Sequence, residues 1–349
     1  MRKRKSKKII IIGCIVLILL LSAGLIYAFV TKGNAKKELD VQEEKVEESK
    51  KKVTIIDIDS KTRPYAVMIN CHDAALPQSG LQDAYIVYEL MVEAGITRMM
   101  ALFKDVSFDK VGSIRSARTQ YLGYVYENDA IYVHAGGALD ALERISNEGI
   151  SDIDVDGQYG VRDAELRKTR AYEHTLFTNT DLLSMSVNDK NIRKTKDVAN
   201  LLNYSADEVD FSKYETKEAN NISIRYSDYR TSNYTYDSTN KNYLRSMNDI
   251  DNVDLITGNQ YHVKNIIVYG VNYSTYTHHG YYGYQKIDNI GSGEGYYITN
   301  GLAIPIIWEK KDEKSQTVYK IKEDGKELVV NDGNTYIQIY PTAGNLSIN

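Results

Sequence analysis

The sequence predicts an α+β protein with an N-terminal membrane helix, then a layered sheet-and-helix domain and a β-rich C-terminal domain. Residues 9–30 form an apolar run without a charge. The segment AIYVHAGGALDALERI is typical of a strand, a glycine turn and a helix. From residue 222 onward, tyrosine-rich segments alternate with a period of two, which favours antiparallel strands. These patterns divide the chain into residues 1–30 (basic stub and anchor), 31–52 (charged linker), 53–203 (first domain) and 220–343 (second domain).

The composition is that of a folded protein, because 42% of the residues are hydrophobic and 26% are charged. The 349 residues are about twice the usual domain size, which favours two domains. Lys+Arg 43 against Asp+Glu 47 gives a net charge of −4, so no nucleic-acid partner is expected. Tyr is abundant at 29 residues, and it suits sheets and wet surfaces better than dry cores.

The N-terminal segment predicts a single-pass membrane anchor. The first residues, MRKRKSKK, are basic, and residues 9–30 would span about 33 Å as a helix at about 1.5 Å per residue. The basic flank keeps the N-terminus cytoplasmic and places the folded part outside the cell membrane. Cys14 and Cys71 would then lie on opposite sides of the membrane boundary, so no disulfide is expected between them.

Two alternatives to an uncleaved anchor remain open. The residues around Ser22–Gly24 resemble a signal-peptide cleavage site, and the stretch before Cys14 resembles a lipidation box. The spanning length of the apolar run favours the uncleaved anchor. Residues 31–52 are rich in Lys and Glu, which is typical of a solvated tether, so the folded part is expected to begin near Val53.

The first domain is expected to open with a strand in PYAVMIN and then a hairpin. Residues 86–92 alternate, Ala94-Gly95 is a turn candidate, and ITRMMALF is the returning strand. With a two-residue loop, Met91 would oppose Arg98. The glutamates Glu89 and Glu93 would then share the face of Arg98, opposite an apolar face.

The remaining elements follow from turn and capping residues. Ser116 is a candidate N-cap for a helix that begins after SIRSAR. His134 would end a strand, at the sheet edge where α/β proteins tend to bind ligands. Residues 153–180 are polar and punctuated, and residues 181–202 are expected to be partly helical. The second domain is expected to be antiparallel and β-rich, with a strand after the glycines at Gly291.

The motifs RPYAVMIN, VGSIRSAR, YVHAGG and GSGEGYYITNGLAIPIIW occur in the order found in one family. Over roughly residues 62–341 the sequence resembles the YerB-like family of bacterial lipoprotein-like proteins of unknown function. The resemblance implies a two-part α+β fold and an extracytoplasmic location, but it brings no established activity. Family members often carry a lipobox cysteine, a proline before His174 and a histidine where this chain has Asn252.

Polar residues among apolar strands are the candidates for a binding or catalytic site. A glycan hydrolase needs two carboxyl groups across a sugar. Glu89 and Glu93 would be about 13–14 Å apart at about 3.4 Å per residue, so a partner such as Asp163 would be needed. The alternative is that Arg98 pairs with the glutamates on a half-exposed sheet face. The candidate ligand-binding residues are Glu89, Glu93, Arg98, Arg115, Arg118, His134, Arg162, Asp163 and His174.

Two of these groups have a specific chemical rationale. Arg115 and Arg118 could bind a phosphate or carboxylate, helped by backbone N–H groups at a helix start near Ser116, or they could be surface salt bridges. His134, before Gly136, could be a general base or a ligand contact. The alternative for His134 is a buried ring bonded to a carbonyl group.

An acidic segment suggests a calcium loop. Asp152, Asp154 and Asp156 form D-x-D-x-D-G, and Asp163 stands where the last carboxylate ligand would be. The alternative is an ordinary acidic turn. No other cofactor is expected: the pair His278–His279 has no Cys or acidic residue nearby in the sequence, so no metal role is predicted for it.

These features support three hypotheses of function. The first is a non-enzymatic envelope module that binds a cell-wall glycan, an anionic polymer or another envelope protein. The second is an envelope hydrolase that acts on a glycan or a phosphodiester, with carboxylates and His134 in the chemistry. The third is a structural partner in a membrane complex. The first is favoured, because no tight acid–base or nucleophile motif is present.

Overall fold

The computed structural model describes residues 24, 27–30, 32 and 51–349. Of the predicted anchor, only Gly24 and residues 27–30 are described, and they are helical. No helix in the described part is long and apolar enough to cross a membrane. The predicted basic stub, most of the anchor with Cys14, and nearly all of the linker lie outside the described residues.

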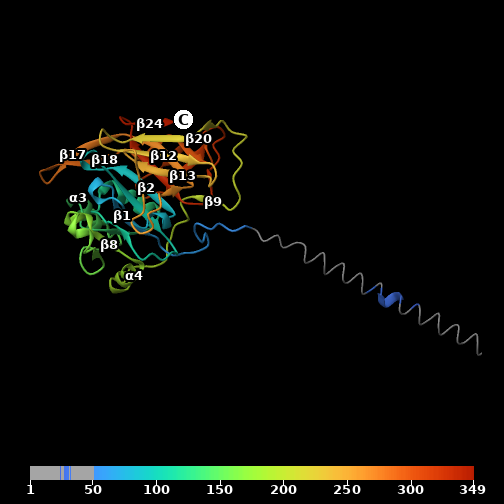
Figure 1. Cartoon of the computed structure of the whole chain (residues 1–349), viewed down its shortest axis with the longest axis horizontal. Helices are drawn as coiled ribbons and strands as arrows, with labels where there is room; N and C mark the ends of the chain where they lie inside the picture. Colours follow the sequence, from blue (N-terminus) through green and yellow to red (C-terminus); the bar gives the residue numbers. More distant parts are fainter. Residues whose placement is uncertain (1–23, 25–26, 31, 33–50) are drawn as a thin grey trace, which may run out of the picture. The chain divides into compact units, whose positions relative to one another are not determined.

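Residues Val53–Asn349 form one compact unit around an eleven-stranded mixed sheet (Figure 1). Its order is β10-β20-β19-β16-β23-β2-β3-β1-β5-β6, with β21 paired to β20. Strands β2 and β23 pair in parallel at its centre, so both halves of the chain contribute to one sheet. The strands are β1 (Tyr65–Asn70), β2 (Ile86–Met91), β3 (Thr97–Phe103), β5 (Ile131–His134), β6 (Asp152–Asp154), β10 (Lys217–Glu218), β16 (Asn265–Val271), β19 (Gly291–Thr299), β20 (Leu302–Lys310), β21 (Val318–Ile321) and β23 (Thr335–Pro341).

A second sheet of six strands comes from the C-terminal half and has the order β14-β13-β12-β11-β24, with β15 paired to β13. Apolar side chains of β11–β13, such as Ile224 and Tyr234, pack with Val67 and Val87 of the central sheet. The second sheet therefore covers one face of the first. Its strands are β11 (Asn221–Arg225), β12 (Thr231–Asp237), β13 (Asn242–Met247), β14 (Ile250–Asp251), β15 (His262–Val263) and β24 (Asn345–Ile348).

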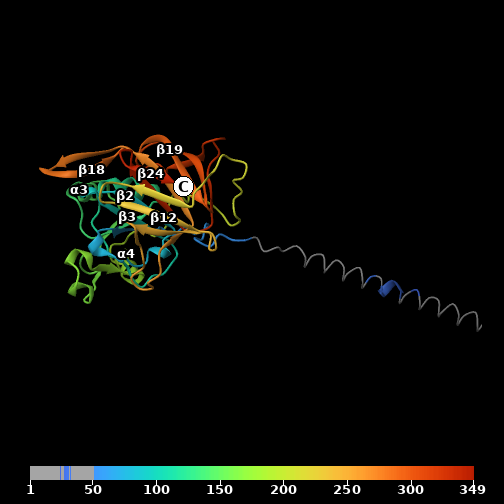
Figure 2. The same ribbon diagram turned by 45° about the horizontal axis from the view of Figure 1, so that its top comes forward.

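Helices α2 and α3 cover the opposite face of the central sheet, where Leu122 and Ile145 pack on Tyr88 and Met100. The hairpin β17–β18 projects from the body beside α3 (Figures 1 and 2). Within residues 51–349, the helices are α2 (Leu122–Glu127), α3 (Leu139–Glu148), α4 (Thr180–Asp189) and the 3₁₀ turns Asp73–Ala75, Leu81–Asp83, Glu93–Gly95, Thr119–Tyr121, Leu166–Lys168 and Tyr172–His174. The remaining strands are β4 (Val111–Gly112), β7 (Val161–Arg162), β8 (Leu176–Thr178), β9 (Asn203–Ser205), β17 (Tyr273–His278), β18 (Tyr281–Ile287) and β22 (Val329–Asn331).

The coarse prediction of a strand-rich α+β fold is confirmed, including the strand, glycine turn and helix at β5 and α3. Gly149 ends α3 in a left-handed conformation at φ 66°, and the Asn179 side chain caps α4 by accepting from the Leu182 N–H. The predicted cap at Ser116 is wrong. The chain there is extended, and α2 begins only at Leu122 after a 3₁₀ turn.

The predicted hairpin register is also wrong by one residue. Met91 pairs with Thr97, and Leu90 pairs with Arg98. The turn Glu93–Gly95 is longer than a two-residue loop because Ala94 and Gly95 both adopt left-handed φ angles of 59° and 72°. Since side chains alternate along a strand, this shift places Glu89 and Arg98 on opposite faces of the sheet.

Many more tyrosine side chains are buried in the dry interior than we expected from the sequence. Ten of the twelve largest fully buried side chains are tyrosines. Several of their hydroxyl groups are bonded inside the protein: Tyr88 donates to Glu127 at 2.7 Å, and Tyr297 donates to Asn265 at 2.7 Å, whereas the hydroxyl group of Tyr234 has no partner among the described residues. A buried tyrosine is tolerated when its polar end is bonded in this way.

Candidate functional site

Three arginines gather at the carboxyl edge of the parallel strands β1 and β5. Arg98 is the second residue of β3 and pairs with Asn70, the last residue of β1. Arg115 lies on the segment beside β1, where its N–H donates to the Met68 carbonyl group. Arg118 follows it, and its own N–H donates to the Tyr132 hydroxyl group. We call Arg98, Arg115 and Arg118 the arginine cluster.

The members of the cluster differ in their partners. Arg118 is paired with Glu93 at 2.8 Å. The buried Arg98 donates to the Ser116 carbonyl oxygen at 2.6 Å. Among the described residues, the half-buried guanidinium of Arg115 has neither a hydrogen bond nor an ion pair. Burial, and then the charges of Arg118 and Arg115, lower the pKa of Arg98 to about 9.

The ring of His174 lies beside the arginine cluster. The Asn70 amide nitrogen lies 2.9 Å from Nδ1 of His174, and the Asn70 amide oxygen accepts from the His72 N–H. Nδ1 therefore accepts, and the proton of the neutral ring is on Nε2. The ring of His72 stacks on that of His174 with centroids 5.0 Å apart. The structure thus brings Glu93, three arginines and His174 into one region.

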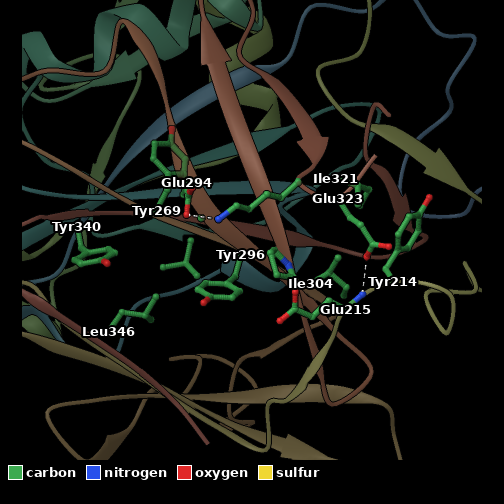
Figure 3. A pocket seen from close by; sticks show the side chains of 14 residues that line it. Tyr214, Glu215, Tyr269, Glu294, Tyr296, Ile304, Ile321, Glu323, Tyr340 and Leu346 are labelled. Carbon is green, nitrogen blue, oxygen red and sulfur yellow. Dashed lines mark hydrogen bonds and ion pairs between the residues drawn. The ribbon is translucent and has the colours of Figure 1, made fainter. Parts of the chain in front are cut away.

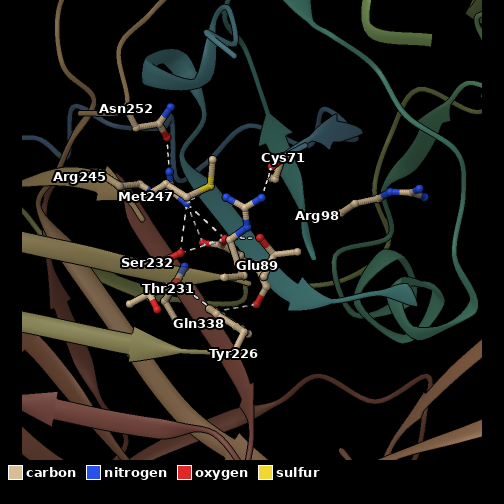
Figure 4. Close-up of polar contacts among 12 residues, drawn as sticks. Cys71, Glu89, Arg98, Tyr226, Thr231, Ser232, Arg245, Met247, Asn252 and Gln338 are labelled. Atoms are coloured by element: carbon tan, nitrogen blue, oxygen red, sulfur yellow. Dashed lines mark hydrogen bonds and ion pairs between the residues drawn. The ribbon is translucent and has the colours of Figure 1, made fainter. Parts of the chain in front are cut away.

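Glu89 lies on the other face of the sheet and is sealed between the two sheets (Figure 4). Its carboxylate pairs with Arg245 of β13 at 3.0 Å, and neither side chain is exposed. Thr97 and Ser232 also donate to it, at 2.7 and 3.0 Å. Arg98, which the sequence suggested as its partner, points away from this network.

His134 is buried at the end of β5, and both of its ring nitrogens have partners. Nδ1 lies 2.9 Å from the Gly136 carbonyl oxygen, and Nε2 lies 3.2 Å from the Asp152 carboxylate. Asp154 accepts from the backbone N–H groups of Gly136 and Asp156. These contacts hold the loop that connects β5 to α3.

The four carboxylates of the suggested calcium loop are directed to different partners. Asp152 contacts His134, and Asp156 pairs with Arg162 at 2.7 Å. Asp163 is held elsewhere, by Lys110 at 2.5 Å and by two backbone N–H groups. Arg162 also lies over the ring of Tyr172, with Cζ 3.5 Å from the centroid. The structure does not gather these four side chains around a common point in the described chain.

Two further groupings were not found from the sequence. The first is a cavity of about 450 Å³ in the C-terminal half, between β16, β19, β20 and β21. Tyr340 and Leu346 lie at one end, Glu294 and Tyr296 lie nearer that end, and Tyr214 and Glu323 lie at the other (Figure 3). The abundance of tyrosine was a signal for such a surface, but its residues come from strands far apart in the chain.

The second grouping overturns the expectation that His278 and His279 lack an acidic neighbour. Nε2 of His278 and Nε2 of His279 each lie 2.9 Å from a carboxylate oxygen of Glu143 on α3. Glu143 is more than a hundred residues away in the sequence, so no local motif indicated the contact.

Family comparison identifies this two-part architecture. Residues 53–193 match the N-terminal domain, and residues 222–337 match the C-terminal domain, of the family described as "Protein of unknown function (DUF3048)". The chain belongs to that family. Because β2 and β23 pair, the segments matched by the two family models share the central sheet.

Its relatives include the protein named "Putative lipoprotein YerB" from Bacillus subtilis (strain 168). The two are 29% identical over 298 residues, which cover 83% of this chain and 84% of that protein. The structure is similar to the crystal structure of YerB protein from Bacillus subtilis, with a TM-score of 0.70 and 27% identity over 82% of this chain and 94% of that chain. The resemblance to the YerB-like family is therefore confirmed.

Proposed function

We propose that this chain is an envelope protein that binds an anionic group, a phosphate or a carboxylate, of an envelope polymer at the arginine cluster. The lipoprotein name of its relative supports an envelope location. The basic start and apolar run of residues 1–30 support an anchor with the N-terminus in the cytoplasm and the folded part outside. The proposed partners are thus the membrane and one envelope polymer.

The observation that carries the proposal is the guanidinium of Arg115. A half-buried cation without a partner is costly unless something else neutralises it. Burial lowers the pKa of Arg115 and the charge of Arg118 lowers it further, while the carboxylate of Glu173 opposes them without forming an ion pair. An oxyanion would reduce this repulsion, and a guanidinium can bind it with two parallel hydrogen bonds.

Binding of a polyphosphate chain by the full-length protein tests the proposal. Arg115→Ala should weaken binding at least tenfold at fixed ionic strength, and Arg115→Lys should restore only part of it, because an ammonium lacks the planar fork. Arg193→Ala is the matched control, since Arg193 is paired with Asp129 outside the cluster. Equal binding by the wild type and Arg115→Ala would refute the proposal.

A neutral cell-wall glycan is the second candidate ligand, and the tyrosine-lined cavity favours it. Aromatic faces and carboxylates are the groups that contact sugar rings and hydroxyls in wet sites. A neutral N-acetylglucosamine oligomer in the same assay distinguishes the two candidates. If the oligomer binds and Tyr296→Ala abolishes that binding while Arg115→Ala does not, the cavity is the ligand site.

A hydrolase has no comparable support. The carboxylate of Glu89 is fully enclosed, and both ring nitrogens of His134 are bonded. Neither group is placed to exchange a proton with a substrate in this arrangement.

A further inference from the structure

The tip of the hairpin β17–β18 brings two histidines and a glutamate together. His278, His279 and Glu143 each offer one ligand atom, and these atoms lie within 4.8 Å of one another. Within the described part of the chain, no other group of three His, Cys, Asp or Glu side chains meets this condition. The grouping shares no residue with the arginine cluster or the tyrosine-lined cavity, and the proposed function does not use it.

We infer that Glu143, His278 and His279 bind a divalent cation of the Zn²⁺ type. Two imidazole nitrogens and one carboxylate oxygen form a donor set that suits zinc, and they leave a fourth position for water. Bonds of about 2.0–2.1 Å in a tetrahedral site place ligand atoms about 3.3 Å apart. Both Nε2 atoms are now 2.9 Å from a carboxylate oxygen, and all three ligand atoms lie within 4.8 Å of one another, so small side-chain shifts would bring them to that spacing.

The turn of the hairpin explains why both rings reach the same carboxylate. Consecutive side chains of a strand point to opposite faces. His279 has a left-handed φ of 46°, and Gly280 follows with a φ of 79°. This turn directs both rings toward α3. Their planes are 73° apart with centroids 4.4 Å apart, so the rings do not stack on each other.

The hairpin is already held against α3 without an ion. Tyr276 of β17 donates a hydrogen bond to Asp140, one turn before Glu143, and Thr119 donates to the same carboxylate oxygen. The ring of Tyr284 packs against that of His278, with centroids 6.1 Å apart. The ligands are therefore positioned before binding, which reduces the entropy that an ion would have to offset.

A bound ion would join α3 to a hairpin that lies more than a hundred residues later in the sequence. Because the unfolded chain does not hold these three side chains together, the ion should bind the folded state preferentially and stabilise it. The three side chains are partly exposed, with fractions of 46%, 28% and 61% for Glu143, His278 and His279. The ion could thus exchange with solution.

The test is Zn²⁺ binding by the full-length protein without a polyhistidine tag, in competition with a chromophoric chelator. One Zn²⁺ should bind per chain, and Zn²⁺ should raise the melting temperature. Glu143→Gln should weaken binding at least tenfold, and His278→Ala combined with His279→Asn should weaken it at least a hundredfold. When Co²⁺ replaces Zn²⁺, the protein should show the intense visible absorption of a four-coordinate site. Excess Ca²⁺ should not displace the bound Co²⁺.

Matched control variants distinguish binding at this site from nonspecific binding of Zn²⁺ to surface histidines. His262→Ala removes another exposed histidine, and Glu165→Gln removes an exposed carboxylate elsewhere. Both should bind Zn²⁺ like the wild type. Circular dichroism should show that all variants are folded. The inference is wrong if micromolar Zn²⁺ does not bind, or if the folded Glu143→Gln and histidine variants bind it as well as the wild type.

Discussion

At the scale of single residues, the protonation of His174, beside the arginine cluster, should make the stability of the folded state depend on pH. Burial lowers the pKa of His174, and the positive charges of His72, Arg115 and Arg170 lower it further, while Glu173 opposes them. The native state therefore binds the proton of this ring less readily than the unfolded chain does. The unfolded chain takes up the proton as the pH falls through about 6.5.

This difference predicts the direction of one pH effect. Above about pH 6.5 both states are neutral at His174, so the residue contributes no pH dependence. As the pH falls below that value, unfolding is favoured, and the loss of stability levels off below the native pKa. His174→Gln should therefore lose less unfolding free energy than the wild type between pH 7.5 and 5.0 in urea titrations. His262→Gln, at an exposed site, should keep the wild-type slope, and identical slopes for His174→Gln would contradict the assignment.

At the scale of elements, the pair Glu89–Arg245 joins β2 of the central sheet to β13 of the second sheet. Removing one member leaves the other as an uncompensated charge in the core. Arg245→Met should thus lower the unfolding free energy by about 3–5 kcal/mol, measured by denaturant titration. The double variant Glu89→Gln with Arg245→Met should be less destabilised than the sum of its single changes, because no buried charge is left.

An exposed ion pair gives the matched control for this prediction. Lys320 and Glu309 pair at 2.6 Å on neighbouring strands, with side chains 34% and 47% exposed. Lys320→Met should cost less than about 1 kcal/mol, because water screens the pair. A similarly small cost for Arg245→Met would show that solvent reaches Glu89 in solution.

At the scale of the whole molecule, the central sheet crosses the boundary between the two family segments. The parallel pairing of β2 with β23 runs from Ile86–Thr335 to Leu90–Ile339. Neither segment can keep its half of the sheet without exposing a buried strand edge. We therefore expect residues 53–349 to unfold as one cooperative unit.

Two local probes test this expectation. Trp308, the one tryptophan of the chain, lies in the C-terminal segment, and Cys71 lies in the N-terminal segment. Burial raises the pKa of the Cys71 thiol to about 12, so it should react only after opening. In a Cys14→Ser background, tryptophan fluorescence and thiol labelling should give the same denaturant midpoint. Separate midpoints would show that the segments unfold independently.

The sequence by itself determined the local elements and the family. The strands β1 and β5, the helices α3 and α4, the β-rich second half and the basic segment around Arg115 all follow from the spacing of neighbouring residues. Such spacing reports which face of an element is apolar, and it needs no knowledge of distant partners.

Only the tertiary structure decided which side chains meet. Two left-handed residues in the turn after β2 shifted the register by one and moved Glu89 to the face of Arg245, more than a hundred residues later. Glu143 contacts His278 and His279 because the hairpin β17–β18 packs against α3. Periodicity fixes a side chain's direction within its own element, but its partner is set by how separate elements pack.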